Sequence, residues 1–462
     1  MNKVLHEKVD ADFDNLVQDL SGCIAIRSVL DESKCTKEHP FGAKLTEALD
    51  YFLASASKLG FRTRNIDNMV GYAEMGEGPK LVGVLAHLDV VPEGELAAWT
   101  YPPYAAEIHD GIIYGRGVVD DKGPAFAALH AMKALRDSGV RLGCRVRVIV
   151  GIDEETGSRC MVRYNKTEET PTLSFSPDAN FPLINAEKGR LYSNFEREFA
   201  TGGAGPRLVS MTGGTRPNVV PDKAEAVFEG EFAPADEKAL AAAQGITVSK
   251  AGGKTTVAAK GIAAHAMNPE KGDNAIVKLF AALGKAKWQP QGAPEYAAAV
   301  AESFADTRCT GLGLARTDEV SGPLTCNLAI LNYADGKLTL STDMRYPVTL
   351  SGDDLIKDYE KTLAALGAKL IVNAHGKPLY VDAASPLIKK LLEAYKNVTG
   401  IDDQPRSTGG GTYCRNFPNA VSFGPNFPGD VDLDHQPNER VSLDLYRKTF
   451  HLYAEALDLL VK

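Results

Sequence analysis

The chain has 462 residues, of which 44% are hydrophobic and 24% are charged, and this composition excludes a disordered, collagen-like or coiled-coil protein. At roughly 150 residues per domain, the length predicts two or three domains. The formal net charge is -9, without a long run of one sign, which argues against partners such as nucleic acid or an anionic membrane. A small-molecule partner is the expectation that remains.

Targeting and membrane signals are absent from the sequence pattern. The N-terminal segment carries no apolar stretch of signal-peptide length, and no apolar run approaches the ~18 residues that a membrane span needs. The seven cysteines are widely spaced and form no Cys-x-x-Cys pair, which is typical of reduced thiols. We therefore expect a cytoplasmic protein with no membrane span and no structural zinc knuckle.

Apolar spacing in the first part of the chain predicts helices over residues 8–27 and 43–58. Two continuous apolar runs follow, at residues 81–86 and 145–152, and they are typical of strands buried on both faces of a parallel sheet. Between them, Phe126, Leu129, Met132 and Leu135 share one face of a predicted helix. This order predicts a strand–helix–strand unit with parallel strands.

The pattern changes between about residues 190 and 375. Alternating strands are predicted near 191–199, 325–332 and 337–344, with a hairpin at 251–253 and helices near 273–286 and 353–366. After residue 378, a helix at 386–398, a strand at 420–423 and a final helix from 442 restore the α/β pattern. We therefore expect an α/β domain, with a mixed, mostly parallel sheet flanked by helices, formed by residues 1–186 and 377–462. An α+β domain, residues 187–376, is inserted into it.

Polar side chains follow three of the predicted buried strands. His87 and Asp89 come after the first strand, Glu154 and Glu155 after the second, and Asp178 after a strand at 172–176. Because ligands bind at the carboxyl ends of strands in open α/β sheets, these groups are expected to meet. Taken singly, the His–Asp pair also fits a local strand-end cap, and the acidic run fits a solvated surface.

Two further segments add ligand-type side chains. Residues 115–124 carry Asp120 and Asp121, and residues 434–439 carry His435. Histidine and carboxylate without cysteine suit zinc, manganese or cobalt. The number of groups exceeds what one tetrahedral ion needs and fits two ions ~3.5–4 Å apart that share a carboxylate and a water. Such a site turns water into hydroxide near neutral pH, so the pattern predicts hydrolysis.

Other motifs fail on inspection. Lys254 and Thr255 resemble the end of a phosphate loop, but the glycine required earlier is Val248, so no nucleotide site is expected. No Gly-x-Ser-x-Gly elbow of a serine hydrolase occurs. The run Gly409–Gly411 is instead interpreted as a tight loop or as backbone that approaches a substrate closely.

Taken together and in order, these motifs resemble the co-catalytic metallopeptidase family of aminoacylases, carnosinases, desuccinylases and dipeptidase V-like enzymes, the last most closely. The resemblance covers nearly the whole chain and implies a zinc-peptidase-like fold. It implies two divalent ions, zinc first, with manganese or cobalt as alternatives. It also implies that five residues are metal ligands, with Asp120 as the bridging one: His87, Asp120, Glu155, Asp178 and His435.

The same resemblance implies that Asp89 orients the His87 ring and that Glu154 is the general base. It also implies that residues 1–186 and 377–462 form the catalytic domain and that the inserted domain is a lid, whose His265 stabilises the oxyanion of the tetrahedral intermediate. The remaining substrate contacts would come from Arg345, which suits a free C-terminal carboxylate, and from three further residues: Asn218, Gly410 and Gly411.

The resulting expectation is a metal-dependent dipeptidase that cleaves dipeptides with a free C-terminal carboxylate through a metal-bridging hydroxide. The alternative on the same scaffold is an N-acyl-amino-acid amidohydrolase. A binding module that has lost catalysis is a third reading, against which the retained Glu154 argues. The resemblance to dipeptidase V-like enzymes, which have an enlarged lid, implies a monomer, with a homodimer as the other option.

Overall fold

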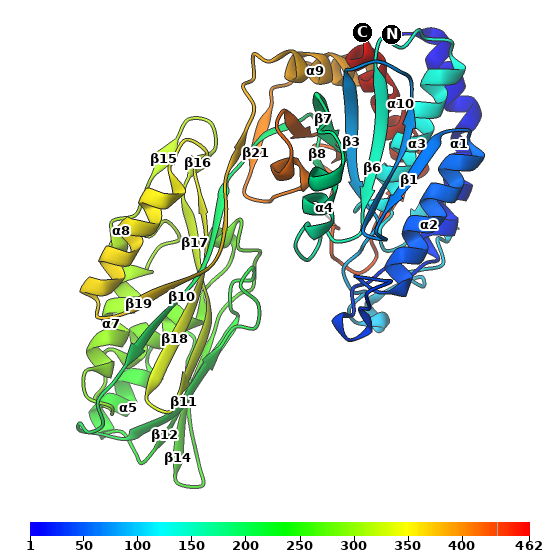
Figure 1. Cartoon of the computed structure of the whole chain (residues 1–462). Helices are drawn as coiled ribbons and strands as arrows, with labels where there is room; N and C mark the ends of the chain where they lie inside the picture. Colours follow the sequence, from blue (N-terminus) through cyan, green and yellow to red (C-terminus); the bar gives the residue numbers. More distant parts are fainter. Residues whose placement is uncertain (432) are drawn as a thin grey trace. The chain divides into compact units, whose positions relative to one another are not determined.

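The structure is a computed structural model that describes residues 1–431 and 433–462, and it divides into two compact units. The first unit comprises Met1–Asn185, Tyr380–Arg406 and Gly411–Lys462. The second comprises Ala186–Leu379 and Ser407–Gly410. In Figure 1 the first unit contains both ends of the chain, in blue and red, and the second is mostly green and yellow.

The described residues form ten α-helices, six of them in the first unit. These six are α1 (Lys3–Ile24), α2 (Ala43–Lys58), α3 (Lys122–Asp137), α4 (Arg159–Thr167), α9 (Pro386–Thr399) and α10 (Leu443–Val461). The second unit holds α5 (Pro234–Ala241), α6 (Ala275–Leu283), α7 (Ala293–Ser303) and α8 (Gly352–Ala365).

The larger sheet has nine strands and a parallel centre. Its order is β1 (Arg62–Ile66), β2 (Val70–Met75), β6 (Arg145–Gly151), β3 (Leu81–His87), β7 (Leu173–Ser176), β22 (Ala420–Ser422), β9 (Ile184–Glu187) and β20 (Leu379–Tyr380), with β21 (Arg406–Thr408) beside β9. The neighbours β6, β3, β7 and β22 are parallel, whereas β1, β2 and β9 pair antiparallel. The expected mixed, mostly parallel sheet is confirmed.

Helices cover both faces of this sheet. A side chain at Gly71 in β2 would meet Leu49 and Leu53 of α2, whereas the next residue, Tyr72, packs its ring against Tyr164 of α4. Since successive strand residues point to opposite faces, α2 and α4 lie on opposite sides of the sheet. Burial on both faces explains why every residue of β3 is buried and why its sequence is a continuous apolar run.

Three small sheets complete the description outside the two large ones. β4 (Ile108–His109) and β24 (Arg440–Ser442) flank β5 (Ile112–Tyr114), β8 (Ala179–Asn180) pairs with β23 (Pro425–Asn426), and β15 (Thr317–Asp318) pairs with β16 (Gly322–Pro323). The pairing of β24 with β5 brings residues around 440 beside residues around 113, far apart in the sequence.

The second unit contains an eight-stranded antiparallel sheet. Its order is β13 (Ile246–Ala251), β14 (Lys254–Lys260), β12 (Lys223–Glu229), β11 (Arg207–Gly213), β17 (Thr325–Ala334), β18 (Lys337–Tyr346), β10 (Gly189–Glu198) and β19 (Lys369–Gly376). The apolar face of this sheet and the helices α6, α7 and α8 form one hydrophobic core. The α+β character expected for the middle of the chain is present.

Several local predictions can be compared with the structure. The first helix spans Lys3–Ile24 rather than 8–27, because the Asn2 side chain accepts from the backbone N–H of Leu5 and starts the helix earlier. Gly252 and Gly253 form the β13–β14 turn with φ of 60° and 75°, so this segment is the expected hairpin. The sequence pattern predicts no strands at β11 and β12, because their exposed residues interrupt the apolar run.

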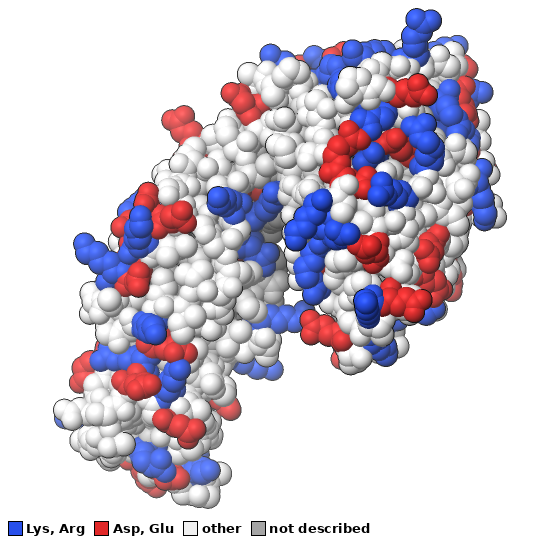
Figure 2. Space-filling view, viewed as in Figure 1, with Lys and Arg blue, Asp and Glu red and all other residues white. Residues whose placement is uncertain are grey.

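The chemical expectations on cysteines and membrane spans can also be compared. All seven cysteines are free thiols. No helix among the described residues is both long and apolar enough to cross a membrane. On the face shown in Figure 2, acidic and basic side chains are interspersed.

Candidate metal centre

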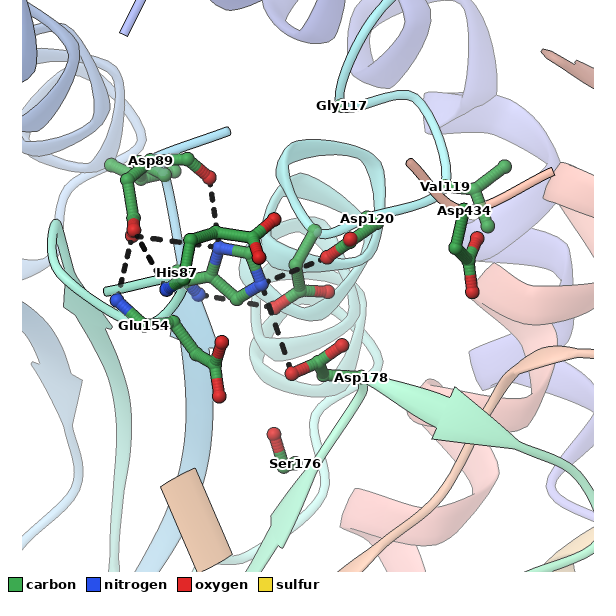
Figure 3. A network of polar contacts seen from close by, with 12 residues as sticks. His87, Asp89, Gly117, Val119, Asp120, Glu154, Ser176, Asp178 and Asp434 are labelled. Carbon is green, nitrogen blue, oxygen red and sulfur yellow. Dashed lines mark hydrogen bonds and ion pairs between the residues drawn. The ribbon is translucent and has the colours of Figure 1, made fainter. Parts of the chain in front are cut away.

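The parallel strands of the first unit end at a cluster of histidines and carboxylates. His87 is the last residue of β3, and it lies opposite Gly151, the last residue of β6, in the parallel register. Glu154 and Glu155 follow β6, and Asp178 follows β7, which also pairs with β3. Figure 3 shows the side chains of His87, Glu154 and Asp178 gathered at these three adjacent strand ends.

The His87 ring is held so that one nitrogen faces the carboxylates. Its Nδ1 lies 2.9 Å from the backbone carbonyl oxygen of Asp89, so Nδ1 is the protonated nitrogen that donates to this carbonyl. The other ring nitrogen, Nε2, faces the carboxylates, 2.9 Å from Asp120 Oδ1 and 3.7 Å from Asp178 Oδ2. This buried Nε2 has no hydrogen bond of acceptable geometry. An imidazole whose Nδ1 is hydrogen-bonded to a carbonyl and whose Nε2 faces carboxylates has the orientation of a metal ligand.

Asp89 organises two parts of the site. Its carboxylate accepts hydrogen bonds from the backbone N–H groups of Glu154, at 3.1 Å, and Glu155, at 3.0 Å, while Oδ1 lies 3.5 Å from His87 Nδ1. Only 2% of Asp89 is exposed. Asp89 thus holds both the turn that carries the two glutamates and the ring of His87.

Asp120 lies between the two histidines. Its Oδ1 faces His87, and its Oδ2 lies 3.0 Å from Nε2 of His435. The same His435 nitrogen lies 3.1 Å from Glu155 Oε1. One carboxylate that faces two imidazoles is the arrangement needed for a ligand shared by two ions.

Two groups of three side chains could each hold an ion. In each group the ligand atoms lie within 4.8 Å of one another: His87, Glu154 and Asp178 form one, and Asp120, Glu155 and His435 form the other. Nitrogen and carboxylate donors without thiolate match the ligand preferences of zinc, manganese and cobalt. The residues present therefore fit a pair of divalent cations.

The electrostatics of the cluster show an excess of negative charge. Burial raises the pKa of the Glu154 carboxyl to about 8, the charges of Glu155 and Asp89 add to this rise, and His87 opposes it. Burial lowers the pKa of His435, but Asp120 and Glu155 outweigh this effect and raise it to about 12. Divalent cations would supply the positive charge that this crowded set of carboxylates lacks.

Asp121, for which the sequence pattern predicts no role, also supports the cluster. Asp121 is fully buried, and its Oδ2 accepts a 3.0 Å hydrogen bond from the backbone N–H of His87. Two adjacent aspartates look alike in sequence, and only the backbone path decides that Asp120 faces the histidine rings. No pattern in the sequence separates their roles.

The proposed lid residues lie in the second unit, apart from Gly411. His265 is exposed, and its Nδ1 accepts from the backbone N–H of Met267 at 3.1 Å. The carbonyl of Asn218 accepts from the backbone N–H of Ala266 at 2.8 Å, so the segments carrying His265 and Asn218 lie side by side. Gly410 ends the second unit's last segment and Gly411 begins the next segment of the first unit.

Arg345 is almost fully buried, with 2% exposed. Its Nε and one terminal nitrogen donate to the two oxygens of Asp343, each at 2.7 Å, and the other terminal nitrogen donates to the Gly409 carbonyl at 2.8 Å. Its planar fork is thus engaged within the second unit. A role as clamp for a substrate carboxylate stays a prediction.

Comparisons with known proteins identify the family. Residues 83–459 match the model of peptidase family M20/M25/M40. The chain is 38% identical over 461 residues to "Putative dipeptidase YtjP" of Bacillus subtilis (strain 168), covering 97% of this chain and 98% of that protein. It is 34% identical over 467 residues to a Staphylococcus haemolyticus protein of the same description, SH1171, covering 98% of each.

Solved structures show a similar fold. Human carnosine dipeptidase 1 aligns with a TM-score of 0.59 at 16% identity, over 100% of this chain and 98% of that chain. A metallo-carboxypeptidase of the M20 family from Sulfolobus solfataricus aligns with a TM-score of 0.57 at 18% identity, over 97% and 99%. The chain belongs to peptidase family M20/M25/M40, and it is a metal-dependent hydrolase.

Proposed function

We propose that this chain is a dipeptidase that uses two divalent cations to hydrolyse dipeptides with a free C-terminal carboxylate. The observation that carries the proposal is the position of Asp120, with one oxygen toward each of His87 and His435, and with Glu154 beside the first of these histidines. The relatives of similar length described as dipeptidases support the substrate class.

Five residues would hold the ions: His87, Asp120, Glu155, Asp178 and His435. Zinc is the first candidate, with manganese and cobalt as alternatives, because all three accept imidazole and carboxylate ligands. When bound, the ions would polarise the peptide carbonyl and make water a stronger nucleophile. Asp89 would keep the His87 ring and the Glu154–Glu155 turn in position.

Glu154 would act as the general base. Its carboxylate lies in the His87 group of ligands, where it can take a proton from the attacking water and return it to the leaving amine nitrogen. In the second unit, the His265 ring would donate a hydrogen bond to the oxyanion. Asn218, Arg345, Gly410 and Gly411 would contact the substrate. We further propose that the protein acts as a monomer in the cytoplasm.

The test is a hydrolysis screen with matched substrates. Purified protein, stripped with a chelator and reloaded with zinc, manganese or cobalt, is assayed on free dipeptides, on N-acetyl and N-succinyl amino acids, and on dipeptides with an amidated C-terminus. We expect hydrolysis of free dipeptides, with metal content near two ions per chain and no activity in the stripped protein. Preferential cleavage of the N-acyl substrates would replace the dipeptidase assignment, and full activity without metal would end the proposal.

A further inference from the structure

The carboxylate of Glu439 lies behind the loop that carries Asp120. Glu439 is fully buried, although it belongs to the loop segment that follows His435. Its Oε1 accepts from the backbone N–H groups of Val119, at 2.9 Å, and Asp120, at 3.2 Å. The backbone N–H of Gly117 lies 3.0 Å from both of its oxygens. Three backbone donors of one loop thus converge on a single side chain.

Arg116 neutralises this buried carboxylate. Its terminal nitrogen lies 2.7 Å from Glu439 Oε2, its guanidinium stacks over the Trp99 ring at 5.3 Å, and only 1% of Arg116 is exposed. Charge-assisted hydrogen bonds of this kind are shorter and stronger than neutral ones. A buried carboxylate with a charged partner and three backbone donors holds the backbone of residues 117–120 in one conformation.

Glu439 is also tied to the second histidine through its own backbone. It lies four residues after His435, and its carbonyl oxygen accepts from the backbone N–H of Gly115 at 3.1 Å. In the same segment, the Asn438 side chain accepts from the backbone N–H of Thr100 at 2.6 Å and donates to the Ala98 carbonyl at 2.8 Å. The His435 segment is therefore fastened to residues 115–120 and 98–100.

We propose that Glu439 is a positioning residue that sets the distance between Asp120 and His435, by bonding the backbone of the Asp120 loop from within the His435 segment. The proposal rests on the proposed two-ion site. Glu439 does not touch the ions or the substrate. It acts through Asp120, whose Oδ2 lies 3.0 Å from His435 Nε2, so the ion held by Asp120, Glu155 and His435 depends on it most.

The decisive variant is Glu439→Gln, which keeps the size of the side chain but replaces one acceptor oxygen by an N–H₂ group facing backbone donors. Residues that orient metal ligands typically contribute about 10- to 100-fold to metal affinity. In a chelator competition, we expect Glu439→Gln to weaken by that factor the binding of the zinc ion at Asp120, Glu155 and His435. The zinc ion at the His87 side of the site should bind as in the wild type. With excess zinc, kcat should recover and KM should stay unchanged.

A readout without metal tests the same contact. In the stripped protein, hydrogen exchange of the Gly117, Val119 and Asp120 amides should be faster in Glu439→Gln than in the wild type. Glu439→Asp keeps the charge but is shorter, so it should show an intermediate loss of zinc affinity. It also serves as the second variant if Glu439→Gln does not fold.

Glu74→Gln is the matched control. Glu74 is 8% exposed and is paired with Arg147 at 2.8 Å, like Glu439 with Arg116, but it lies in β2 away from the metal ligands. It should lower thermal stability without changing zinc affinity. If Glu439→Gln and Glu439→Asp bind two ions as the wild type does, or lose affinity no more than Glu74→Gln, the positioning role is wrong. A wild type that binds no divalent ion would instead overturn the proposed function.

Discussion

At the scale of single residues, neighbours of the same chemistry take different positions because the backbone path around the strand ends separates them. Asp120 faces His87 and His435, whereas Asp121 turns inward to accept from the backbone of His87. Glu155 Oε1 lies 3.1 Å from His435 Nε2, whereas the Glu154 carboxylate belongs to the group formed with His87 and Asp178. Isosteric amide variants of such neighbours can therefore assign their separate roles.

Glu154→Gln and Glu155→Gln are expected to fail in different ways. Loss of a general base typically costs about 10²- to 10⁴-fold in rate, so Glu154→Gln should lose turnover while it retains two ions. Glu155→Gln removes a ligand charge next to His435 and should lower metal content instead. Steady-state kinetics and elemental analysis of both variants are the measurement. The opposite pattern would exchange the two assignments.

Arg345→Ala tests the carboxylate clamp. If Arg345 binds the substrate's C-terminus, KM should rise strongly for free dipeptides and much less for amidated ones, because only a carboxylate can use the bidentate fork. Asp343→Asn is the companion variant, since it weakens the internal partner of the same guanidinium. Equal losses on both substrate types would assign Arg345 to the internal ion pair with Asp343.

At the scale of elements, α1 and α3 are joined by a buried charged cluster as well as by apolar packing. The fully buried His130 ring of α3 contacts Asp12 at 2.7 Å and Asp19 at 3.1 Å, both on α1, and Lys133 lies 3.2 Å from Asp12. Burial lowers the pKa of His130, but the hydrogen bonds to the two aspartates outweigh it and raise the pKa. Burial raises the pKa of Asp12, but His130 and Asn15 bring it down to about 2.

The cluster predicts a pH range in which the contact between α1 and α3 is most stable. The raised pKa of His130 means that its contribution is complete below the unfolded value of about 6.5 and is lost as pH rises through the folded value. The lowered pKa of Asp12 means that its contribution is present above about 3.9 and is lost as pH falls toward 2. The pairing is therefore strongest between about pH 4 and 6.5.

His130→Gln should remove this dependence. Hydrogen bonds to charged groups contribute about 1.5–3 kcal/mol, so the variant should be less stable by about that amount near pH 5 to 6. The difference from the wild type should shrink as pH rises. Thermal unfolding of chelator-treated protein, from pH 5 to pH 9, measures it. A difference that stays constant over this range would contradict the assigned charges.

At the scale of the whole molecule, the chain leaves the first unit after Asn185, forms the second unit, and returns at Tyr380. A second excursion, Ser407–Gly410, again belongs to the second unit. The expected boundaries near 186 and 376 lie close to the first crossings, whereas the short excursion was not expected. It includes Gly409, whose carbonyl accepts from Arg345, so one hydrogen bond accounts for part of this attachment.

The proposed monomer requires that one chain supply both the metal ligands and His265. Variants His265→Ala and Glu154→Gln, each expected to be nearly inactive, are mixed, unfolded and refolded together. If each site is built from one chain, no activity beyond the sum of the two returns, whereas wild type taken through the same cycle recovers. Substantial complementation would show that sites are shared between chains.

The sequence by itself determined the central strands and the residue types of the site. Six uncharged residues in a row before His87 indicate burial on both faces, and parallel strands then bring their following polar residues to one edge. Hence His87, Glu154, Glu155 and Asp178 were expected to meet, and the structure brings them together with Asp120 and His435.

Only the tertiary structure decided which oxygen faces which nitrogen, and what holds the loops in place. The loop around Asp120 has no regular secondary structure, and its path depends on hydrogen bonds to Glu439, which is distant in the sequence. The local sequence pattern does not predict this contact. The same holds for Arg345, whose hydrogen bond to the Gly409 carbonyl joins residues 64 positions apart in the chain. Periodicity encodes the elements, because each has one buried face, whereas loop positions depend on hydrogen bonds between segments that the sequence keeps separate.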